Sequence, residues 1–209
     1  RIYGLTKGQY SPTSEVGKRT KSSPLGSIDA PVRPLSVALG ANATFVARSI
    51  DREPKHLCQM LTRAHDHKGT SFVEIYQNCN IFNDGAYAPL TDRKQKAAQQ
   101  LILEHGKPLV FSGGEKGIVF DGFTPTIVDV ASVGMDAIHV HDEQADVAYH
   151  HILARMAYPS MPTPIGVFRD IQAPAYDELL NAQLATSRDR SGAGSVSDLL
   201  HSGDTWEVK

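Results

Sequence analysis

The alternation of strand-like and helix-like segments between residues 44 and 76 limits the fold of this chain most strongly. Residues 44–48 read as a strand, and Asp51 with Pro54 then opens a helix that Gly69 ends. Residues 71–76 are rich in β-branched and aromatic side chains, which indicates a second strand. A strand, a helix and a strand in this order predict two parallel strands, so we expect an α/β fold.

The flanking segments have weaker patterns. Residues 4–34 are rich in Thr, Ser, Pro, Gly and Lys and predict a long loop. Apolar residues at helical spacing, Leu57, Met60, Leu61 and Ala64, are expected on one face of the helix after Pro54. We further expect a helix over 34–40, an exposed helix over 92–105, a hairpin over 108–120, a short strand over 138–141, a helix over 146–158, a strand over 165–168 and a helix over 176–184.

Composition excludes several classes of function. The 209 residues carry a formal net charge of -2, with 41% apolar and 21% charged residues, so no basic surface for nucleic acid is expected. The longest apolar stretches are far shorter than the roughly 20 residues that cross a bilayer, and no secretory signal is visible. The two cysteines cannot form a disulfide framework, and we expect a cytoplasmic protein.

Cys79 and the opening residues are the candidates for chemistry. Cys79 follows the strand over 71–76, at the edge of a parallel sheet where ligands collect, although free cysteines are often small buried residues. Cys58 lies between apolar residues at helical spacing and is expected to be structural. Residues 2–9 combine two glycines, a hydroxyl and a lysine, which would let the backbone approach a charged ligand or simply form a turn.

Two groups of histidines resemble metal sites only superficially. His65 and His67 flank Asp66, and His139 and His141 precede Asp142, but neither group has a third ligand at a recognisable spacing. We therefore expect no metal there. The basic residues Lys18, Arg19 and Lys21 are expected to be solvated charges, with a docking patch as the alternative.

The order of these motifs resembles that in the β subunits of 2-oxoglutarate and related 2-oxoacid:ferredoxin oxidoreductases. The match is specific over residues 2–14 and continues through later motifs in the same order. It covers most of the chain up to about Thr186. The matching segments are Ile2-Tyr3-Gly4-Leu5-Thr6-Lys7-Gly8-Gln9-Tyr10-Ser11-Pro12-Thr13-Ser14, Leu39-Gly40-Ala41, Phe45-Val46-Ala47-Arg48, Val73-Glu74-Ile75, Cys79, Ile81-Phe82-Asn83-Asp84-Gly85 and Gly166-Val167-Phe168-Arg169.

The resemblance implies cofactors and partners. It implies thiamine diphosphate, Mg2+ and a 4Fe-4S cluster, with the backbone carbonyl of Ile2 completing the magnesium shell. Cys79 would be the fourth cluster ligand. Lys7 would help to dock ferredoxin, and an α subunit, a 2-oxoacid and coenzyme A would complete the system. The thiamine diphosphate would be lined by Tyr3, Gly4, Leu5 and Thr6.

The resemblance also implies a fold and a domain division. It implies part of a thiamine-diphosphate-binding three-layer fold with a mainly parallel sheet, followed by a carboxyl-terminal extension. We expect the thiamine-diphosphate domain over 1–90, the extension over 91–185 and a flexible tail over 186–209. Ile2-Tyr3 reads as the end of a strand already under way, so we expect sequence before Arg1 that carries the diphosphate motif and three further cysteines.

The activity that the resemblance implies is oxidative decarboxylation of a 2-oxoacid such as 2-oxoglutarate to an acyl-CoA and CO2, with electrons passed through the cluster to ferredoxin. No side chain here is a clear acid or base, so we assign no catalytic residue. Two alternatives remain: a cluster-free thiamine-dependent decarboxylase, and a non-catalytic fragment that only binds the α subunit. The isolated chain is expected to be inactive.

Overall fold

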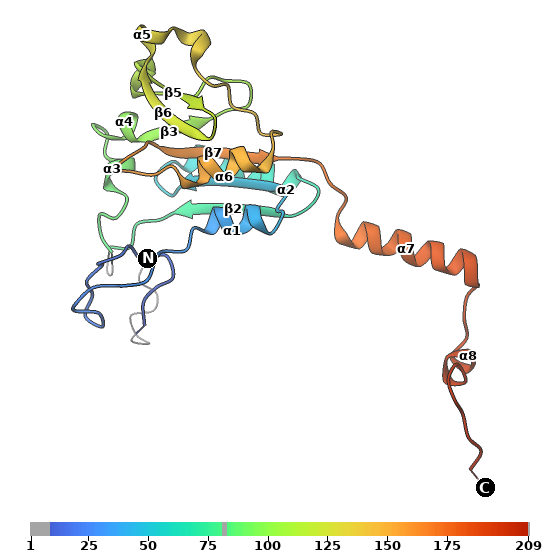
Figure 1. The fold of residues 1–209 in the computed structure, drawn as a ribbon. Coiled ribbons are helices and arrows are strands. Elements are labelled where there is room, and N and C mark those ends of the chain that lie inside the picture. The colour runs from blue at the N-terminus through green and yellow to red at the C-terminus, as the bar shows by residue number, and fades with distance from the viewer. Residues whose placement is uncertain (1–8, 81–82, 209) are drawn as a thin grey trace. The chain divides into compact units, whose positions relative to one another are not determined.

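A computed structural model describes residues 9–80 and 83–208 of the chain (Figure 1). The chain forms two compact units, Arg1–Gln172 and Ala173–Lys209. No helix in the described ranges is both long and apolar enough to cross a membrane.

The first unit contains most of the regular elements. Its helices are α1 (Pro34–Gly40), α2 (Pro54–Asp66), α3 (Ala88–Thr91), α4 (Lys96–Gln99), η2 (Ser112–Gly114), α5 (Val130–Val133), η3 (Met135–Ala137) and α6 (Val147–Arg155). Its strands are β1 (Phe45–Ile50), β2 (Ser71–Tyr76), β3 (Gln100–Leu103), β4 (Val110–Phe111), β5 (Lys116–Asp121), β6 (Thr124–Asp129) and β7 (Thr163–Asp170).

Four strands form the central sheet in the order β2-β1-β7-β3. The pairs β1–β2 and β3–β7 are parallel, whereas β7 runs antiparallel to β1. Helix α2 connects the parallel strands β1 and β2, as the alternating pattern predicts. The α/β class with a mostly parallel sheet is thus confirmed, and the one antiparallel pair makes the sheet mixed.

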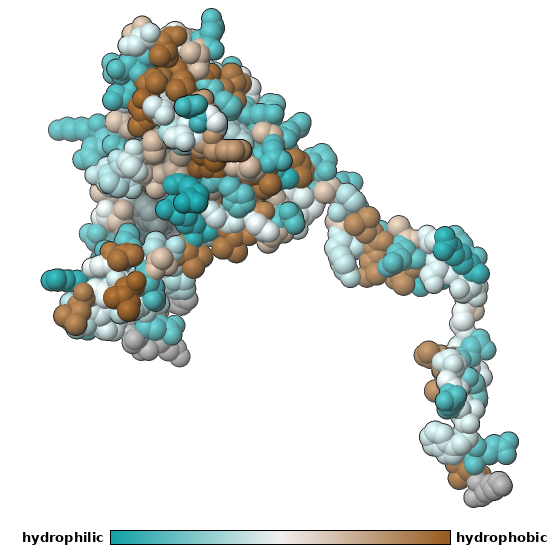
Figure 2. Space-filling model, in the orientation of Figure 1, coloured by the Kyte–Doolittle hydropathy of each residue, from teal (hydrophilic) through white to brown (hydrophobic). Residues whose placement is uncertain are grey.

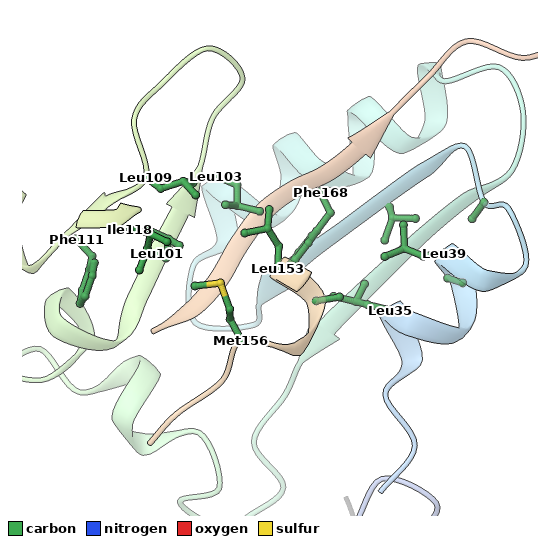
Figure 3. Close-up of a cluster of buried hydrophobic side chains, with 14 of the residues drawn as sticks. Leu35, Leu39, Leu101, Leu103, Leu109, Phe111, Ile118, Leu153, Met156 and Phe168 are labelled. Carbon is green, nitrogen blue, oxygen red and sulfur yellow. The ribbon is translucent and has the colours of Figure 1, made fainter. Parts of the chain in front are cut away.

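Helices cover both faces of this sheet and give three layers. Successive residues of a strand point to opposite faces. Val46 of β1 belongs to the large apolar cluster that includes Leu35 of α1 and Leu153 of α6 (Figure 3). Its neighbours Phe45 and Ala47 belong to the cluster that includes Met60 of α2. All six residues of β1 are buried, as expected for a strand enclosed on both faces.

The expected helix over 92–105 is wrong. The structure has two short helices, α3 and α4, followed by β3, which pairs with β7. Leu101 and Leu103 are buried whereas Ile102 between them is 41% exposed, which is the period of two of a strand. The alternating pattern of a four-residue strand is too short to be recognised in the sequence when helix-forming residues precede it.

The hairpin over 108–120 is confirmed and extends into a second sheet. Strands β4, β5 and β6 pair antiparallel in that order, and sequence analysis did not predict β6. The expected strand over 138–141 is an irregular extended segment instead. Its His139 donates its backbone N–H to Ile118 and accepts from Leu109, and only Val140 forms a β-bridge, with Pro108.

Residues 17–27 form an ordered excursion of the long loop before α1, here called the basic tongue (Figure 1). Gly17 donates its N–H to Ser27 O at 2.6 Å, and Ser27 donates to Lys18 O at 3.1 Å. Gly26 has a φ of +97°, and a Cβ placed there would lie 2.8 Å from Gly17 O. The close approach at Gly26 therefore requires glycine, and Gly17 has a φ of +80°, which also favours glycine.

The second unit consists of α7 (Tyr176–Ser191), α8 (Val196–Leu200) and their connections. Local capping encodes α8, since Ser195 and Asp198 exchange side-chain and backbone hydrogen bonds of 3.0 and 3.1 Å. Neither helix buries a residue, and hydrophobic surface lies over this unit (Figure 2). The helix expected over 176–184 is confirmed and continues to Ser191. The three-part domain division stays a prediction, although β1 and β7 share one sheet.

Candidate functional site

Cys79 lies three residues beyond the end of β2, in a loop that its neighbours close. The residue is partly buried. Asn83 donates its backbone N–H to Cys79 O at 3.0 Å. The side chain of Asn78 spans the loop, donating to Asp84 Oδ1 at 2.8 Å and accepting from Gly85 N at 3.0 Å. The sequence-based position of Cys79 just past a strand end is confirmed, and the loop that presents it is defined by local polar contacts. We call the described residues 77–80 and 83–85 the cysteine loop.

Two contacts attach the cysteine loop to the rest of the unit. Asp51, directly after β1, donates its N–H to Tyr76 O at 3.0 Å and accepts from Asn78 N at 3.3 Å. Lys18 of the basic tongue donates from Nζ to Asn83 Oδ1 at 2.6 Å. Strand β1 and the tongue therefore both hold the segment that carries Cys79.

A buried ion pair lies in the strands beneath this loop. Arg48 of β1 donates from Nε to Glu74 Oε2 of β2 at 2.8 Å, and both side chains are 5% exposed. Nη1 also donates to Pro164 O of β7 at 3.1 Å. The rings of Tyr76 and Phe168 lie 4.9 and 5.2 Å from the guanidinium. The pair links three strands, and its geometry offsets the cost of removing two charges from water.

A cavity of about 300 Å3 opens beside this pair. Its lining includes Arg48, Glu74 and the stacked rings of Tyr76 and Tyr87, whose centroids lie 4.5 Å apart. The loop before α1 contributes further residues, among them Arg33. The cavity could accommodate a ligand group with both polar and apolar parts.

The other expected site residues cannot be placed. Ile2, Tyr3, Gly4, Leu5, Thr6 and Lys7 lie outside the described residues. Their roles toward thiamine diphosphate, magnesium and ferredoxin therefore stay predictions.

Cys58 does not occupy the buried position that its spacing suggests. It is exposed on α2, and Leu61 beside it is 46% exposed. The core is contacted instead by Met60 and Ala64 of the same helix. The apolar face of α2 is therefore rotated away from Leu61, and Cys58 belongs to a shallow surface hollow.

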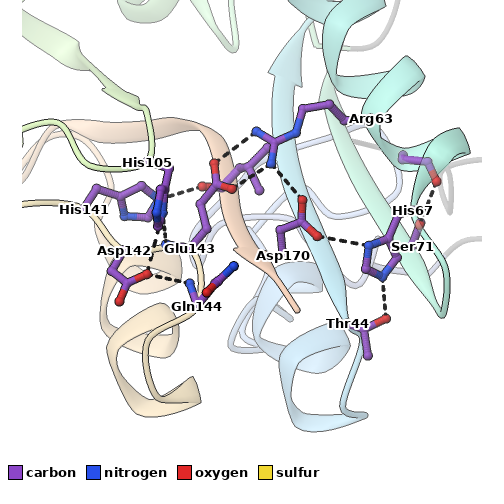
Figure 4. A network of polar contacts seen from close by, with 12 residues as sticks. Thr44, Arg63, His67, Ser71, His105, His141, Asp142, Glu143, Gln144 and Asp170 are labelled. Atoms are coloured by element: carbon purple, nitrogen blue, oxygen red, sulfur yellow. Dashed lines mark hydrogen bonds and ion pairs between the residues drawn. The ribbon is translucent and has the colours of Figure 1, made fainter. Parts of the chain in front are cut away.

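His67 lies in a hydrogen-bonded chain that resembles a hydroxyl–histidine–carboxylate triad (Figure 4). Asp170 Oδ1 lies 3.0 Å from Nδ1, and Thr44 Oγ1 lies 2.8 Å from Nε2. The Thr44 hydroxyl also accepts from Thr70 N at 2.9 Å, and the His67 side chain is only 1% exposed. The cavities beside Arg48, Arg63 and Cys58 are not lined by Thr44 or His67. The chain of contacts therefore joins the ends of β1, α2 and β7 and is structural.

Arg63 extends this network along α2. Its guanidinium contacts Glu143 at 2.7 and 3.0 Å and Asp170 at 2.8 Å (Figure 4). The hydrogen bond to Glu143 raises the pKa of Arg63 above its usual range. Beside it lies a cavity of about 540 Å3 with mixed charges, which gives no clear ligand preference.

The second histidine group lies in an aromatic cluster. His141 is buried, with Nε2 2.8 Å from Val167 O and Nδ1 2.9 Å from the Tyr149 hydroxyl. Because a carbonyl only accepts, Nε2 carries the hydrogen and Nδ1 accepts from Tyr149. Burial lowers the pKa of His141 and raises that of Tyr149. Across residues 9–80 and 83–208, no group of three or more His, Cys, Asp or Glu could hold a metal ion.

Known proteins with similar sequences support one family. Residues 1–75 match the family described as thiamine pyrophosphate enzyme, C-terminal TPP binding domain. The chain is 47% identical, over its whole length, to the 2-oxoglutarate oxidoreductase subunit KorB of Mycobacterium tuberculosis and spans 57% of that protein. It is 41% identical over 83 residues to the β subunit of the 2-oxoacid:ferredoxin oxidoreductase of Saccharolobus solfataricus, or 40% of this chain and 27% of that protein.

A solved structure has the same fold. A chain of the 2-oxoglutarate:ferredoxin oxidoreductase from Magnetococcus marinus, with 2-oxoglutarate, coenzyme A and succinyl-CoA bound, aligns with a TM-score of 0.63 and 24% identity. The alignment covers 98% of this chain and 55% of that chain. The chain thus spans little more than half the length of the Mycobacterium tuberculosis subunit and of the Magnetococcus marinus chain. The sequence similarity over the whole chain identifies it as a relative of the β subunits of 2-oxoacid:ferredoxin oxidoreductases, and the fold agrees. This is the family that the resemblance in its motifs implied.

Proposed function

We propose that the chain is part of the β subunit of an enzyme that oxidises a 2-oxoacid, with 2-oxoglutarate as the first candidate. The 2-oxoacid and coenzyme A would give an acyl-CoA, CO2, a proton and two electrons, and two ferredoxins would each accept one electron. The observation that carries this proposal is the 47% identity to KorB over the whole chain. An α subunit is the expected partner, because the relatives are β subunits.

The cofactor roles are part of this proposal. Thiamine diphosphate is supported by the family match over residues 1–75. Ile2 would offer its carbonyl oxygen to Mg2+, an ion that prefers oxygen ligands. Tyr3, Gly4, Leu5 and Thr6 would line the cofactor, and Lys7 would contribute positive charge toward ferredoxin.

Cys79 is proposed as one thiolate ligand of a 4Fe-4S cluster. Its sulfur fits such a role, since the residue is partly buried in a loop that Asn78 closes against Asp84 and Gly85. The cysteine loop supplies one cysteine and a cluster normally takes four, so the remaining ligands must come from other parts of the protein. When bound, the cluster would supply one-electron transfer. The residues around Cys79 would hold its sulfur in place.

The two cysteines of the chain provide a matched experiment. Cys79→Ser and Cys58→Ser would each be made in the full-length β subunit and purified anaerobically with the α subunit. We expect the Cys79 variant to lose cluster iron and its visible absorbance together with ferredoxin reduction, whereas the exposed Cys58 tolerates the change.

Each result has a definite meaning. Wild-type complex that reduces no ferredoxin with 2-oxoacid, coenzyme A, thiamine diphosphate and magnesium would refute the proposed function. A Cys79→Ser complex with full iron content would refute the ligand role alone, whereas an active wild-type complex without iron would favour a cluster-free enzyme.

A further inference from the structure

The basic tongue presents a built surface, because backbone contacts hold its two sides together. Besides the bonds between Gly17, Lys18 and Ser27, Thr20 and Ser23 pair through two backbone hydrogen bonds of 3.2 Å. Ser23, Gly26 and Ser27 are buried within it. Its exposed side chains are therefore displayed from a defined backbone.

The exposed charged residues within the tongue are basic, and exposed apolar residues lie beside them. Arg19 and Lys21 are exposed, whereas Lys18 is partly buried. No acidic residue lies from Val16 to Ile28, and the exposed Glu15 and Asp29 flank this stretch. Leu25 is 95% exposed and Ile28 81% exposed. Basic residues around exposed apolar side chains are suited to an acidic protein surface, since opposite charges steer the encounter and the apolar contacts hold it.

The tongue also lies against the cysteine loop. Lys18 reaches Asn83 at 2.6 Å, and Asn83 is itself bonded to the backbone of Cys79 at 3.0 Å. The charge of the tongue is therefore placed next to the residue proposed to hold the cluster.

We propose that the basic tongue is a docking surface for the acidic electron-accepting protein, the ferredoxin of the proposed reaction. This inference rests on the proposed function, because it takes Cys79 to mark the exit of electrons. Encounters of redox proteins bury small interfaces, below about 1,200 Å2, and depend strongly on ionic strength. A compact tongue with two exposed basic residues, Arg19 and Lys21, matches that requirement. The interaction would be brief and salt-sensitive.

The test compares two double charge reversals in the full-length β subunit with its α subunit. Arg19→Glu with Lys21→Glu changes the tongue, and Lys107→Glu with Lys116→Glu makes the same change in charge at exposed residues around the β4–β6 sheet. Activity is measured with an acidic ferredoxin and, separately, with a small dye as electron acceptor. Binding of the same ferredoxin is measured by calorimetry at low salt.

We expect the tongue variant to lose about tenfold in kcat/KM for ferredoxin at low salt, and to approach wild type at about 0.5 M salt, where charges are screened. Dye reduction should not slow, and the control variant should resemble wild type. Leu25→Ser should weaken ferredoxin binding while retaining the salt dependence, because it removes only an apolar contact.

Other outcomes overturn the inference. Equal losses in the tongue and control variants would mean a general effect of net charge, and unchanged binding in the tongue variant would place docking elsewhere. Loss of dye reduction in the tongue variant would mean a defect before electron exit. A wild-type complex that reduces neither dye nor ferredoxin would instead refute the proposed function, and the binding measurement would still decide the docking surface.

Discussion

His150 should make the stability of the chain depend on pH in a predictable range. Its side chain is fully buried on α6, where Nε2 lies 3.0 Å from Ala145 O and Nδ1 has no partner among the described residues. Burial is the largest cause that lowers its pKa to about 4. The unfolded histidine has a pKa of about 6.5. Between these values the unfolded chain binds a proton that the folded chain does not, so acidification favours unfolding.

The magnitude follows from the difference in pKa. Each pKa unit corresponds to about 1.4 kcal/mol, so His150 costs the folded state about 3 kcal/mol once the pH falls to about 4. Between about pH 7 and pH 5 the loss is about 2 kcal/mol, and above about pH 7 it vanishes. His139 and His141, whose pKa values burial also lowers, add to the same trend.

The assay is urea unfolding of the chain and of His150→Gln at several pH values. Glutamine can still donate to Ala145 O but does not titrate, so the variant should lose less stability on acidification than wild type, by about 2 kcal/mol between about pH 7 and pH 5. The exposed His65→Gln serves as control and should keep the wild-type slope. Identical slopes for wild type and His150→Gln would refute the reasoning.

Two further substitutions test the supports of the candidate site. Arg48→Ala removes a buried guanidinium from Glu74, and we expect the free energy of unfolding to fall by about 3–5 kcal/mol in urea titrations, whereas the exposed Arg52→Ala should change it by less than about 0.5 kcal/mol. Gly26→Ala places a Cβ 2.8 Å from Gly17 O, so we expect trypsin to cleave faster after Lys21 with little change in global stability, and Gly40→Ala, where no atom lies near the added Cβ, should cleave as wild type does.

The central βαβ unit could be predicted because its strands and helix carry clear periods of two and 3.6 residues. Residues 71–76 form β2 as expected. The prediction of one helix over 92–105 failed because helix-forming residues precede a strand of only four residues. That strand, β3, pairs with β7, which lies about 60 positions later in the sequence. The pattern on α2 also failed at Leu61, because a helix with apolar residues around much of its surface leaves the buried face ambiguous.

For the candidate site, the sequence predicted the position of Cys79 but not the contacts that hold its loop. The position after a strand rich in β-forming residues was enough to place Cys79 at the sheet edge. The contact between Lys18 and Asn83 joins residues 65 positions apart, and no local pattern encodes it. Lys18 was expected to be a solvated charge, and its bond to Asn83 shows otherwise. The Asx-type bonds of Asn78 could have been suspected from an asparagine that follows a strand and precedes Asp84 and Gly85.

Strand β7 has a consequence for how the chain acquires its structure. It lies between β1 and β3 in the sheet although it is the last strand along the chain. Until residue 170 has left the ribosome, one whole edge of β1 lacks its hydrogen-bonding neighbour, and the apolar groups of Phe45 and Ala47 lack Val167. Nascent chains that have not yet completed β7 should therefore expose an unpaired, aggregation-prone strand edge to chaperones. Premature termination before Thr163 should yield aggregates rather than a smaller folded protein.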